Sequence, residues 1–299
     1  MAHTMTITSR ISISILVLIA LTSIAQPQTA RKLTNGWHPA IAPNGKSVAL
    51  IQEGHLKIFN TRGNLIRKLG SGNWDAQPAW SPDGRKIAFA SYGSTSFKTG
   101  QFSIWIVNAD GSDLHELVDC SKPFGDHFPS WSPDGNKITW THGNRLWIAD
   151  SSGKNAHPLT NPGDSITSAF WEFNPAWSPD CSTIAFLRCD HCRGEDQADE
   201  YELWLIDSSG THERRIEISG LVRLRWSSNP NWLYVSNYAG VLKIQINDPV
   251  EHPCYKFQFA KLGVRWFALS ADERYIVYDT SGPEVKAEVV FDRFVDRID

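Results

Sequence analysis

One motif, Pro-x-Trp-Ser-Pro-Asp, occurs three times in this chain of 299 residues and constrains the fold more than any other feature. The strong copies occupy residues 78–89, 129–140 and 175–186, and weaker copies occupy residues 39–45, 225–230 and 268–273. The position that holds serine in most copies falls at residues 42, 81, 132, 178, 227 and 270. Successive copies are therefore 39 to 51 residues apart, close to the roughly 40 to 50 residues of a four-stranded propeller blade.

Each repeat predicts four strands joined by tight turns. The sequence Ser-Pro-Asp-Gly places proline and glycine where a type I turn favours them. Later strands alternate apolar and polar residues, as in residues 103–107 and 203–206. We therefore predict an all-β protein, a β-propeller of six four-stranded antiparallel blades.

The two ends of the chain predict how the ring closes. Residues 31–35 (RKLTN) resemble residues 157–161 (HPLTN), which read as the end of a fourth strand. The last repeat has little chain left for a fourth strand of its own. We expect residues 31–35 to complete the last blade, which removes two exposed sheet edges.

The repeated tryptophans and aspartates have structural interpretations. The tryptophan recurs at one register beside a turn, at residues 80, 131, 177 and 226, which favours wedges between blades over stacking on a sugar. The aspartate recurs at residues 83, 134 and 180, where local hydrogen bonding to the turn explains it. Neither set predicts a catalytic pair.

Composition and charge exclude two classes of protein. Hydrophobic residues make up 41% of the chain and 13 residues are tryptophan, which excludes a disordered chain. The 29 basic and 32 acidic residues give a net charge of -3, so there is no basic excess to neutralise nucleic-acid phosphates. We expect a globular protein that does not bind nucleic acid.

The N-terminal residues are typical of a signal peptide. Arg10 precedes an apolar run over residues 11–21, and the small residues Ser23 and Ala25 fit a cleavage site before Gln26. The run is shorter than the roughly 20 residues that span a bilayer, although a membrane anchor is the alternative. We expect residues 1–25 to be removed, leaving residues 26–299 as one propeller domain. That domain is expected to be a periplasmic or secreted monomer without a transmembrane segment.

The repeats resemble those of the TolB family, with its WD40-like propeller repeats, from about Trp37 to the C-terminus. The resemblance implies a six-bladed propeller and a protein or peptide partner in the cell envelope. Only about ten residues separate Ala25 from the first repeat, so the α/β domain that precedes the TolB propeller is not expected. The repeats also resemble the propellers of prolyl-oligopeptidase-type enzymes, but no hydrolase domain is expected after them.

Nine polar residues just before the predicted first strands form the candidate binding site at the channel mouth. The long loops 91–101, 119–128, 161–174 and 189–201 are expected on the same face, and extended loops on a rigid scaffold commonly carry binding. Carboxylates from the second to fourth repeats and arginines from the last two could orient a zwitterionic peptide end or hold a cation. The alternative is a set of solvated groups lining a wet channel. The nine are His38, Asp75, Gln77, Asp126, His127, Glu172, Asn174, Arg223 and Arg265.

Cys189 and Cys192 form a second local feature. In an exported protein we expect a disulfide between them, with Cys120 as an alternative partner. The Cys-x-x-Cys spacing could also hold half of a zinc site, but the sequence lacks a matching second pair. With five cysteines in the chain, at least one should remain unpaired.

The preferred function is that of a scaffold that binds a protein or peptide, without cofactor or metal. The sequence contains no nucleophile elbow, phosphate loop or His-Glu-x-x-His motif, so no catalytic residue is predicted. The main alternative is a propeller enzyme of the carbohydrate lyase or lactonase type with a metal at the channel mouth; a sensor of small ligands and a purely structural protein are the others. Support for the enzyme is limited to His38, Gln77 and His127.

Overall fold

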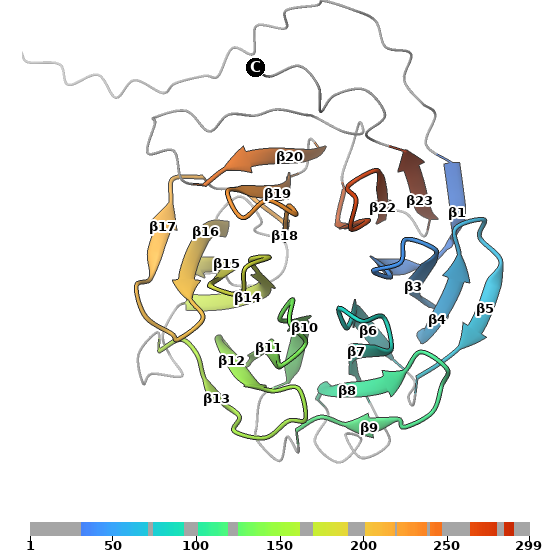
Figure 1. Ribbon diagram of the computed structural model, residues 1–299, viewed down its shortest axis with the longest axis horizontal. Helices are drawn as coiled ribbons and strands as arrows, with labels where there is room; N and C mark the ends of the chain where they lie inside the picture. Colours follow the sequence, from blue (N-terminus) through green and yellow to red (C-terminus); the bar gives the residue numbers. More distant parts are fainter. Residues whose placement is uncertain are drawn as a thin grey trace, which may run out of the picture.

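The computed structural model describes residues 31–70, 74–92, 101–118, 125–161, 170–190, 201–218, 220–237, 240–246, 264–279 and 284–289. All regular secondary structure in these residues is β-strand. The sheets are arranged around a common axis like the blades of a propeller, and every strand pairing is antiparallel (Figure 1). Within the described part of the chain, no helix is long and apolar enough to span a membrane.

The strands fall into four layers from the axis outward. The innermost strands are β2 (Trp37–Ile41), β6 (Asp75–Trp80), β10 (Asp126–Trp131), β14 (Phe170–Trp177), β18 (Arg223–Trp226) and β21 (Trp266–Leu269). The second strands are β3 (Ser47–Gln52), β7 (Lys86–Ser91), β11 (Lys137–His142), β15 (Thr183–Asp190), β19 (Trp232–Asn237) and β22 (Tyr275–Asp279). The third strands are β4 (His55–Asn60), β8 (Ser103–Asn108), β12 (Arg145–Asp150), β16 (Tyr201–Asp207), β20 (Gly240–Gln245) and β23 (Glu284–Val289). The outer strands are β5 (Leu65–Lys68), β9 (His115–Glu116), β13 (His157–Pro158), β17 (Arg214–Ile216) and β1 (Arg31–Asn35).

The described residues form five four-stranded sheets and one three-stranded sheet, β18-β19-β20. The prediction of an all-β propeller with four-stranded antiparallel blades is confirmed, but five complete blades are described where six were predicted. The fourth strand predicted for this repeat would fall within residues 247–263, which lie outside the described residues.

Strand β1 pairs with β23 and so joins the first described residues to the last sheet (Figure 1). It occupies the predicted residues 31–35. Gly63 packs closely against the carbonyl of Leu33 in β1: a Cβ added at Gly63 would lie 2.2 Å from that oxygen. Gly153 makes the same approach to the carbonyl of Leu117, beside the outer strand of another sheet. That β1 stabilises the whole ring stays a prediction.

The tryptophans of the motif lie between adjacent sheets, as predicted. Trp80 donates from Nε1 to the carbonyl of Ala40 in the preceding sheet over 3.1 Å. Trp131 and Trp226 donate to equivalent carbonyls over 3.2 and 2.9 Å. Trp177 instead donates to Thr139 Oγ1. Each indole therefore buries apolar area and pairs its polar atom across the seam.

The Ser-Pro-Asp-Gly turns are closed by their own side chains. Ser81 donates from Oγ to Asp83 Oδ1 over 2.6 Å, and the Asp83 carboxylate accepts the N–H of Arg85. Ser132 and Asp134 repeat the same contact at 2.6 Å. Hydrogen bonds to these ionised carboxylates lower the pKa of Asp83 and Asp134 below the usual value. The structural interpretation of the repeated aspartates is confirmed.

Candidate functional site

The innermost strands of four sheets bulge at one position, directly before the proline of the motif. The pairing register shifts between Trp37 and Ala40 in β2, and β6, β10 and β14 shift at equivalent points. The residue before each proline has φ between 54° and 57°, a left-handed conformation that is uncommon outside glycine. A bulge redirects the side chain at that position. The four redirected residues are His38, Gln77, Phe128 and Asn174.

Five residues at this position or its equivalents in β18 and β21 pack across the axis, and we call them the axial plug: His38, Gln77, Phe128, Arg223 and Trp266. The Trp266 ring lies 4.6 Å from the His38 ring and stacks on Phe128 at 6.1 Å. The Arg223 guanidinium lies 4.5 Å from the centre of the Trp266 ring. Gln77 donates its N–H to His38 Nδ1 over 3.3 Å and accepts the N–H of Phe128 over 2.7 Å.

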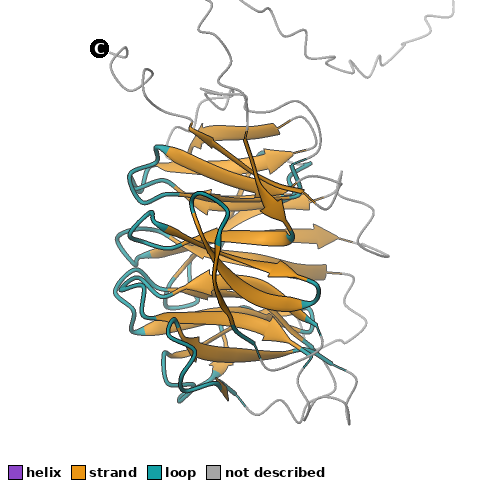
Figure 2. Ribbon diagram, turned by 90° about the vertical axis from the view of Figure 1, so that its right-hand side faces the viewer, coloured by secondary structure: helices purple, strands orange, loops and turns teal. Residues whose placement is uncertain are grey.

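A cavity of about 430 Å³ lies around the axis on the side of the Ser-Pro-Asp-Gly turns. Residues from all six sheets line it. Its deep end contains Gln77, Phe128, Asn174 and Trp266, and its rim includes Pro43, Pro133, Pro179 and Ala271 from the turns. The rim residues Pro133 and Ala271 are exposed, so the cavity opens on the turn face. Most described turns gather on that side of the disc in Figure 2.

One position on the cavity wall holds a small residue in five sheets and a large residue in the sixth. This position directly precedes the tryptophan of the motif or its equivalent. In β18 it is Arg225, whose guanidinium donates to Asn174 Oδ1 over 3.4 Å and to the carbonyl of Leu224 over 2.8 Å. Arg225 also approaches the Trp266 ring, at 5.7 Å. The five small residues are Ala40, Ala79, Ser130, Ala176 and Ala268.

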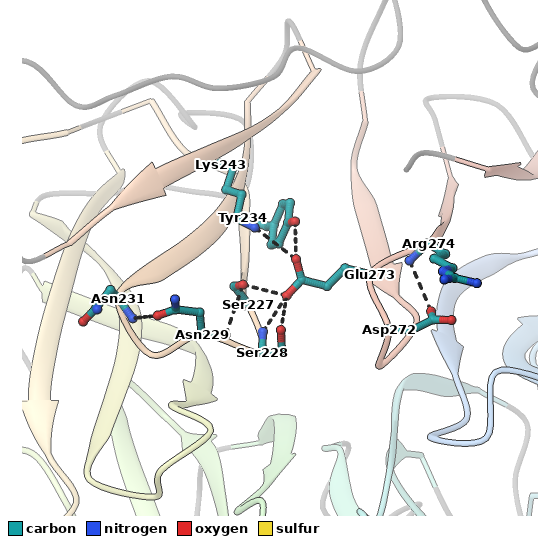
Figure 3. Close-up of polar contacts among 9 residues, drawn as sticks. All are labelled: Ser227, Ser228, Asn229, Asn231, Tyr234, Lys243, Asp272, Glu273 and Arg274. Atoms are coloured by element: carbon teal, nitrogen blue, oxygen red, sulfur yellow. Dashed lines mark hydrogen bonds and ion pairs between the residues drawn. The ribbon is translucent and has the colours of Figure 1, made fainter. Parts of the chain in front are cut away.

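Glu273 lines the cavity rim and joins two sheets (Figure 3). Its carboxylate accepts hydrogen bonds from Ser227 Oγ, Ser228 N–H and Tyr234 OH, each over 2.6 Å, and pairs with Lys243 Nζ at 3.0 Å. Burial opposes ionisation of Glu273, but these hydrogen bonds lower its pKa to about 2. The rim therefore holds a fixed anion that is already neutralised by Lys243.

The three predicted carboxylates are buried and do not line the cavity. Asp75, Asp126 and Glu172 are 5%, 0% and 0% exposed. Asp75 accepts the N–H of Leu56, in the preceding sheet, over 2.8 Å, and Ser91 Oγ over 2.6 Å. These contacts satisfy the carboxylate within the fold, and burial still raises the pKa of Asp75 above its usual value.

Asp126 and Glu172 have equivalent environments. Asp126 Oδ1 lies 2.6 Å from His142 Nδ1 and accepts the Trp140 indole N–H over 3.2 Å. Glu172 accepts the Arg188 guanidinium at 2.5 Å, and burial raises its pKa against the opposing charge of Arg188. Buried charges of this kind are retained when paired. Their contacts link strands within one sheet and between neighbouring sheets. A binding role for these carboxylates stays a prediction.

The predicted cationic side of the site surrounds a fourth buried carboxylate, Asp279. Asp279 is 1% exposed and accepts the His38 N–H over 2.7 Å. Burial raises its pKa to about 6, although Arg223 and Arg265 lower it. The same surroundings lower the pKa of His38 to about 3, first through burial and then through the two arginines. His38 is therefore neutral and accepts at Nδ1. His127 lies outside the cavity lining, with its ring 5.0 Å from that of Phe102.

The structure therefore divides the nine predicted residues. Gln77 and Asn174 line the cavity, His38 and Arg223 lie in or behind its floor, and the other five lie elsewhere. Sequence reasoning missed Phe128, Trp266 and Arg225. A signal was present, because all three occupy fixed positions before the motif tryptophan or its equivalent. The long loops that suggested the opposite face fall mostly outside the described residues.

Cys189 is buried and disulfide-bonded, and its partner lies outside the described residues. Cys192, also outside them, stays the predicted partner. Cys181 has a free thiol and takes the position of the turn glycine at φ 62°. Among the described residues, no three His, Cys, Asp or Glu side chains are grouped so as to hold a metal ion.

Solved structures share this architecture. A putative TolB from Agrobacterium tumefaciens superposes with a TM-score of 0.59 at 18% identity, covering 87% of this chain and 91% of that one. TolB from Acinetobacter baumannii gives a TM-score of 0.55 at 17% identity, covering 84% of this chain and 62% of that one. At these identities the likeness concerns the fold.

Relatives are also found by sequence. An uncharacterized protein of Agrobacterium fabrum is 30% identical over 53% of this chain and 56% of its own length. Dipeptidyl-peptidase 5 of Porphyromonas gingivalis is 32% identical over 43% of this chain but 19% of its own length. Tol-Pal system protein TolB of Anaeromyxobacter dehalogenans is 29% identical over 38% of this chain and 30% of its own length. The matches thus span between about a fifth and a little over half of these relatives. Residues 12–232 match the family described as the TolB β-propeller domain, PD40, and the chain belongs to that family.

Proposed function

We propose that this protein is an exported scaffold of the cell envelope that holds a protein or peptide partner in its central cavity. The observation that carries the proposal is the cavity itself, about 430 Å³ and lined by all six sheets around the axial plug. Its size is in the range of ligand pockets, so it suits a side chain or the end of a peptide rather than a folded domain. Membership of the TolB propeller family supports the same class of function.

The composition of the lining also supports binding. Trp80, Trp131 and Trp226 present aromatic surface on the wall, while Arg225 and Asn174 supply polar groups at depth. A mostly apolar wall with a few placed polar groups is typical of sites that bury a ligand. The proposed site thus faces the turn side, whereas the binding site predicted from the sequence lies on the side of the long loops.

Blocking the cavity tests this role. Ser130 lines the wall in β10 and is only partly buried, so Ser130→Phe fills space without removing a known hydrogen bond of its side chain. Wild-type protein immobilised on resin should retain an envelope component that Ser130→Phe retains at least roughly tenfold less, measured by quantitative mass spectrometry. Ser152→Phe, on an exposed turn away from the cavity, is the matched control and should capture as wild type does. Equal capture by Ser130→Phe, with an unchanged melting temperature, would exclude the cavity as the site.

Export is part of the same proposal and has its own test. The apolar run over residues 11–21 followed by Ser23 and Ala25 supports cleavage before Gln26. Protein recovered from the periplasm or medium should begin at Gln26 on N-terminal sequencing. Full-length protein confined to the cytoplasm would reject export.

A further inference from the structure

The deep end of the cavity collects hydrogen-bond donors. Arg225 projects where five other sheets have alanine or serine. A guanidinium can donate but never accept, so its contact with Asn174 fixes Oδ1 as the amide atom that faces it. The amide Nδ2 of Asn174 is therefore a donor directed elsewhere.

Two of these donors are buried and have no partner within the described residues. Asn174 is 2% exposed and its Nδ2 makes no hydrogen bond there, although the residue lines the cavity. Trp266 is 3% exposed, lines the same end of the cavity, and its Nε1 also lacks a partner among described groups. Leaving a buried donor unpaired costs the free energy of its lost hydration without the return of a hydrogen bond. Both residues line the cavity, so a ligand that brings acceptor oxygens to its deep end would give these two donors the partners that they lack.

The third group supplies positive charge. Arg225 donates only to neutral oxygens in its described contacts, and no described carboxylate lies within ion-pair distance of it. Burial lowers its pKa to about 10, so the guanidinium stays charged at neutral pH. The acid on the cavity rim, Glu273, is already paired with Lys243. A planar guanidinium beside two neutral donors matches the oxygens of a carboxylate.

We propose that Arg225, Asn174 and Trp266 form a carboxylate-binding subsite at the deep end of the cavity. The subsite rests on the proposed peptide-binding function and specifies its anchor. The carboxylate comes from the C-terminus of a peptide or from an acidic side chain, since both present the same two oxygens. Either would neutralise Arg225 and satisfy the two unpaired donors.

Indole N–H resonances provide a direct readout of the subsite. Protein with ¹⁵N-labelled tryptophan would be titrated with N-acetyl-Gly-Gly-Gly, which offers a terminal carboxylate, and with N-acetyl-Gly-Gly-Glu-amide, which offers a side-chain carboxylate. The Trp266 resonance, assigned through its loss in Trp266→Phe, should shift saturably with one or both peptides. The peptide that shifts it identifies the source of the carboxylate. N-acetyl-Gly-Gly-Gln-amide, which has no charge, should leave it in place.

Variants connect the shift to the three residues. Arg225→Gln should weaken carboxylate binding at least tenfold. Asn174→Asp should do the same, because the new carboxylate replaces the donor and pairs with Arg225 itself, while aspartate tolerates the left-handed backbone. Arg85→Gln removes an exposed charge from the turn face outside the cavity and should bind as wild type does. If Arg225→Gln fails to fold, shown by collapsed indole dispersion, Asn174→Asp and the uncharged peptide decide.

The outcomes separate this subsite from the scaffold role. No Trp266 shift with either carboxylate, an equal shift with the uncharged peptide, or unchanged affinity in Asn174→Asp would overturn the subsite. If the envelope component is still captured in a cavity-dependent way, the scaffold role survives that result. If carboxylates bind as expected but nothing is captured, the subsite stands and the scaffold role fails.

Discussion

Two regions of the ring close the turn between their first and second strands in different ways. In the sheets β6–β9, β10–β13 and β14–β17, the serine of this turn donates a hydrogen bond to the aspartate of the same turn. Ser132 Oγ, for example, donates to Asp134. The turn between β18 and β19 reads Ser-Ser-Asn-Pro and lacks that aspartate. Ser227 Oγ instead donates to Glu273, which belongs to the next sheet (Figure 3). A local contact in the regular sheets has become a contact between sheets.

The sheets β18–β20 and β21–β23, which we call the irregular region, also carry the candidate ligand-binding groups. Arg225 replaces the small wall residue, and Trp266 replaces the polar residue or phenylalanine found before the motif proline elsewhere. Both lie in the sheets whose repeats match the motif least. A repeat that keeps the pattern is explained by folding alone, whereas a departure that leaves donors unpaired costs stability. The weak repeats therefore depend structurally on neighbouring sheets and also supply the candidate ligand contacts.

Removal of β1 should destabilise the protein most and tests whether the irregular region depends on this strand. Removing residues 26–36 deletes the strand paired with β23 and takes Leu33 out of a core cluster that includes Leu50 and Val277. We expect a loss of roughly 4 kcal/mol or more of unfolding free energy, because a sheet edge and buried apolar area are exposed together. Thermal unfolding of the truncated and full chains measures it. An unchanged melting temperature would reject ring closure by β1.

A smaller effect compares the two kinds of turn directly. Glu273→Gln removes the charge that Ser227, Tyr234 and Lys243 share, and should cost about 2 kcal/mol, since hydrogen bonds to charged groups are the stronger ones. Asp134→Asn, at an exposed turn of a regular sheet, should cost about 0.5 kcal/mol or less. Urea unfolding of both variants gives the comparison. Equal losses would show that the two regions do not differ in this respect.

The smallest effect concerns pH and has opposite signs at two carboxylates of the irregular region. The lowered pKa of Glu273, about 2, gives stability that is present above its unfolded value of 4.5 and is lost as pH falls toward 2. Burial raises the pKa of Asp279 to about 6 from 3.8, so its contribution is best at low pH and declines as pH rises from about 4 to 6.

Asp279→Asn isolates the second contribution. The amide oxygen can still accept the His38 N–H, but no buried charge forms. Relative to wild type, the variant should gain on the order of 1 to 2 kcal/mol between pH 4 and pH 7. Urea unfolding at pH 4, 5, 6 and 7 follows the difference. A gap that stays constant with pH would show that the pKa of Asp279 is not raised on folding.

The sequence predicted the sheets well because their signals are local. Turn chemistry and strand alternation placed the strands, and the tryptophan register placed the wedges, since each depends on a few neighbouring residues. The site was predicted less well. Asp75, Asp126 and Glu172 read as surface charges before a strand, yet they accept hydrogen bonds from strand residues 14 to 26 positions away in the sequence. No local pattern distinguishes a buried inter-strand tie from a solvated group.

By itself the sequence determined the repeat, the strand layers and the residues 31–35 that pair with the last sheet. It did so because those features repeat or follow from turn and strand preferences of adjacent residues. Which side of the disc holds the cavity was decided only by the tertiary structure. The bulges at His38, Gln77, Phe128 and Asn174 bring side chains to the axis, and the small residues two positions further along the same strands leave space on the turn side. That balance of filled and empty volume arises where six strands meet, so no single segment encodes it.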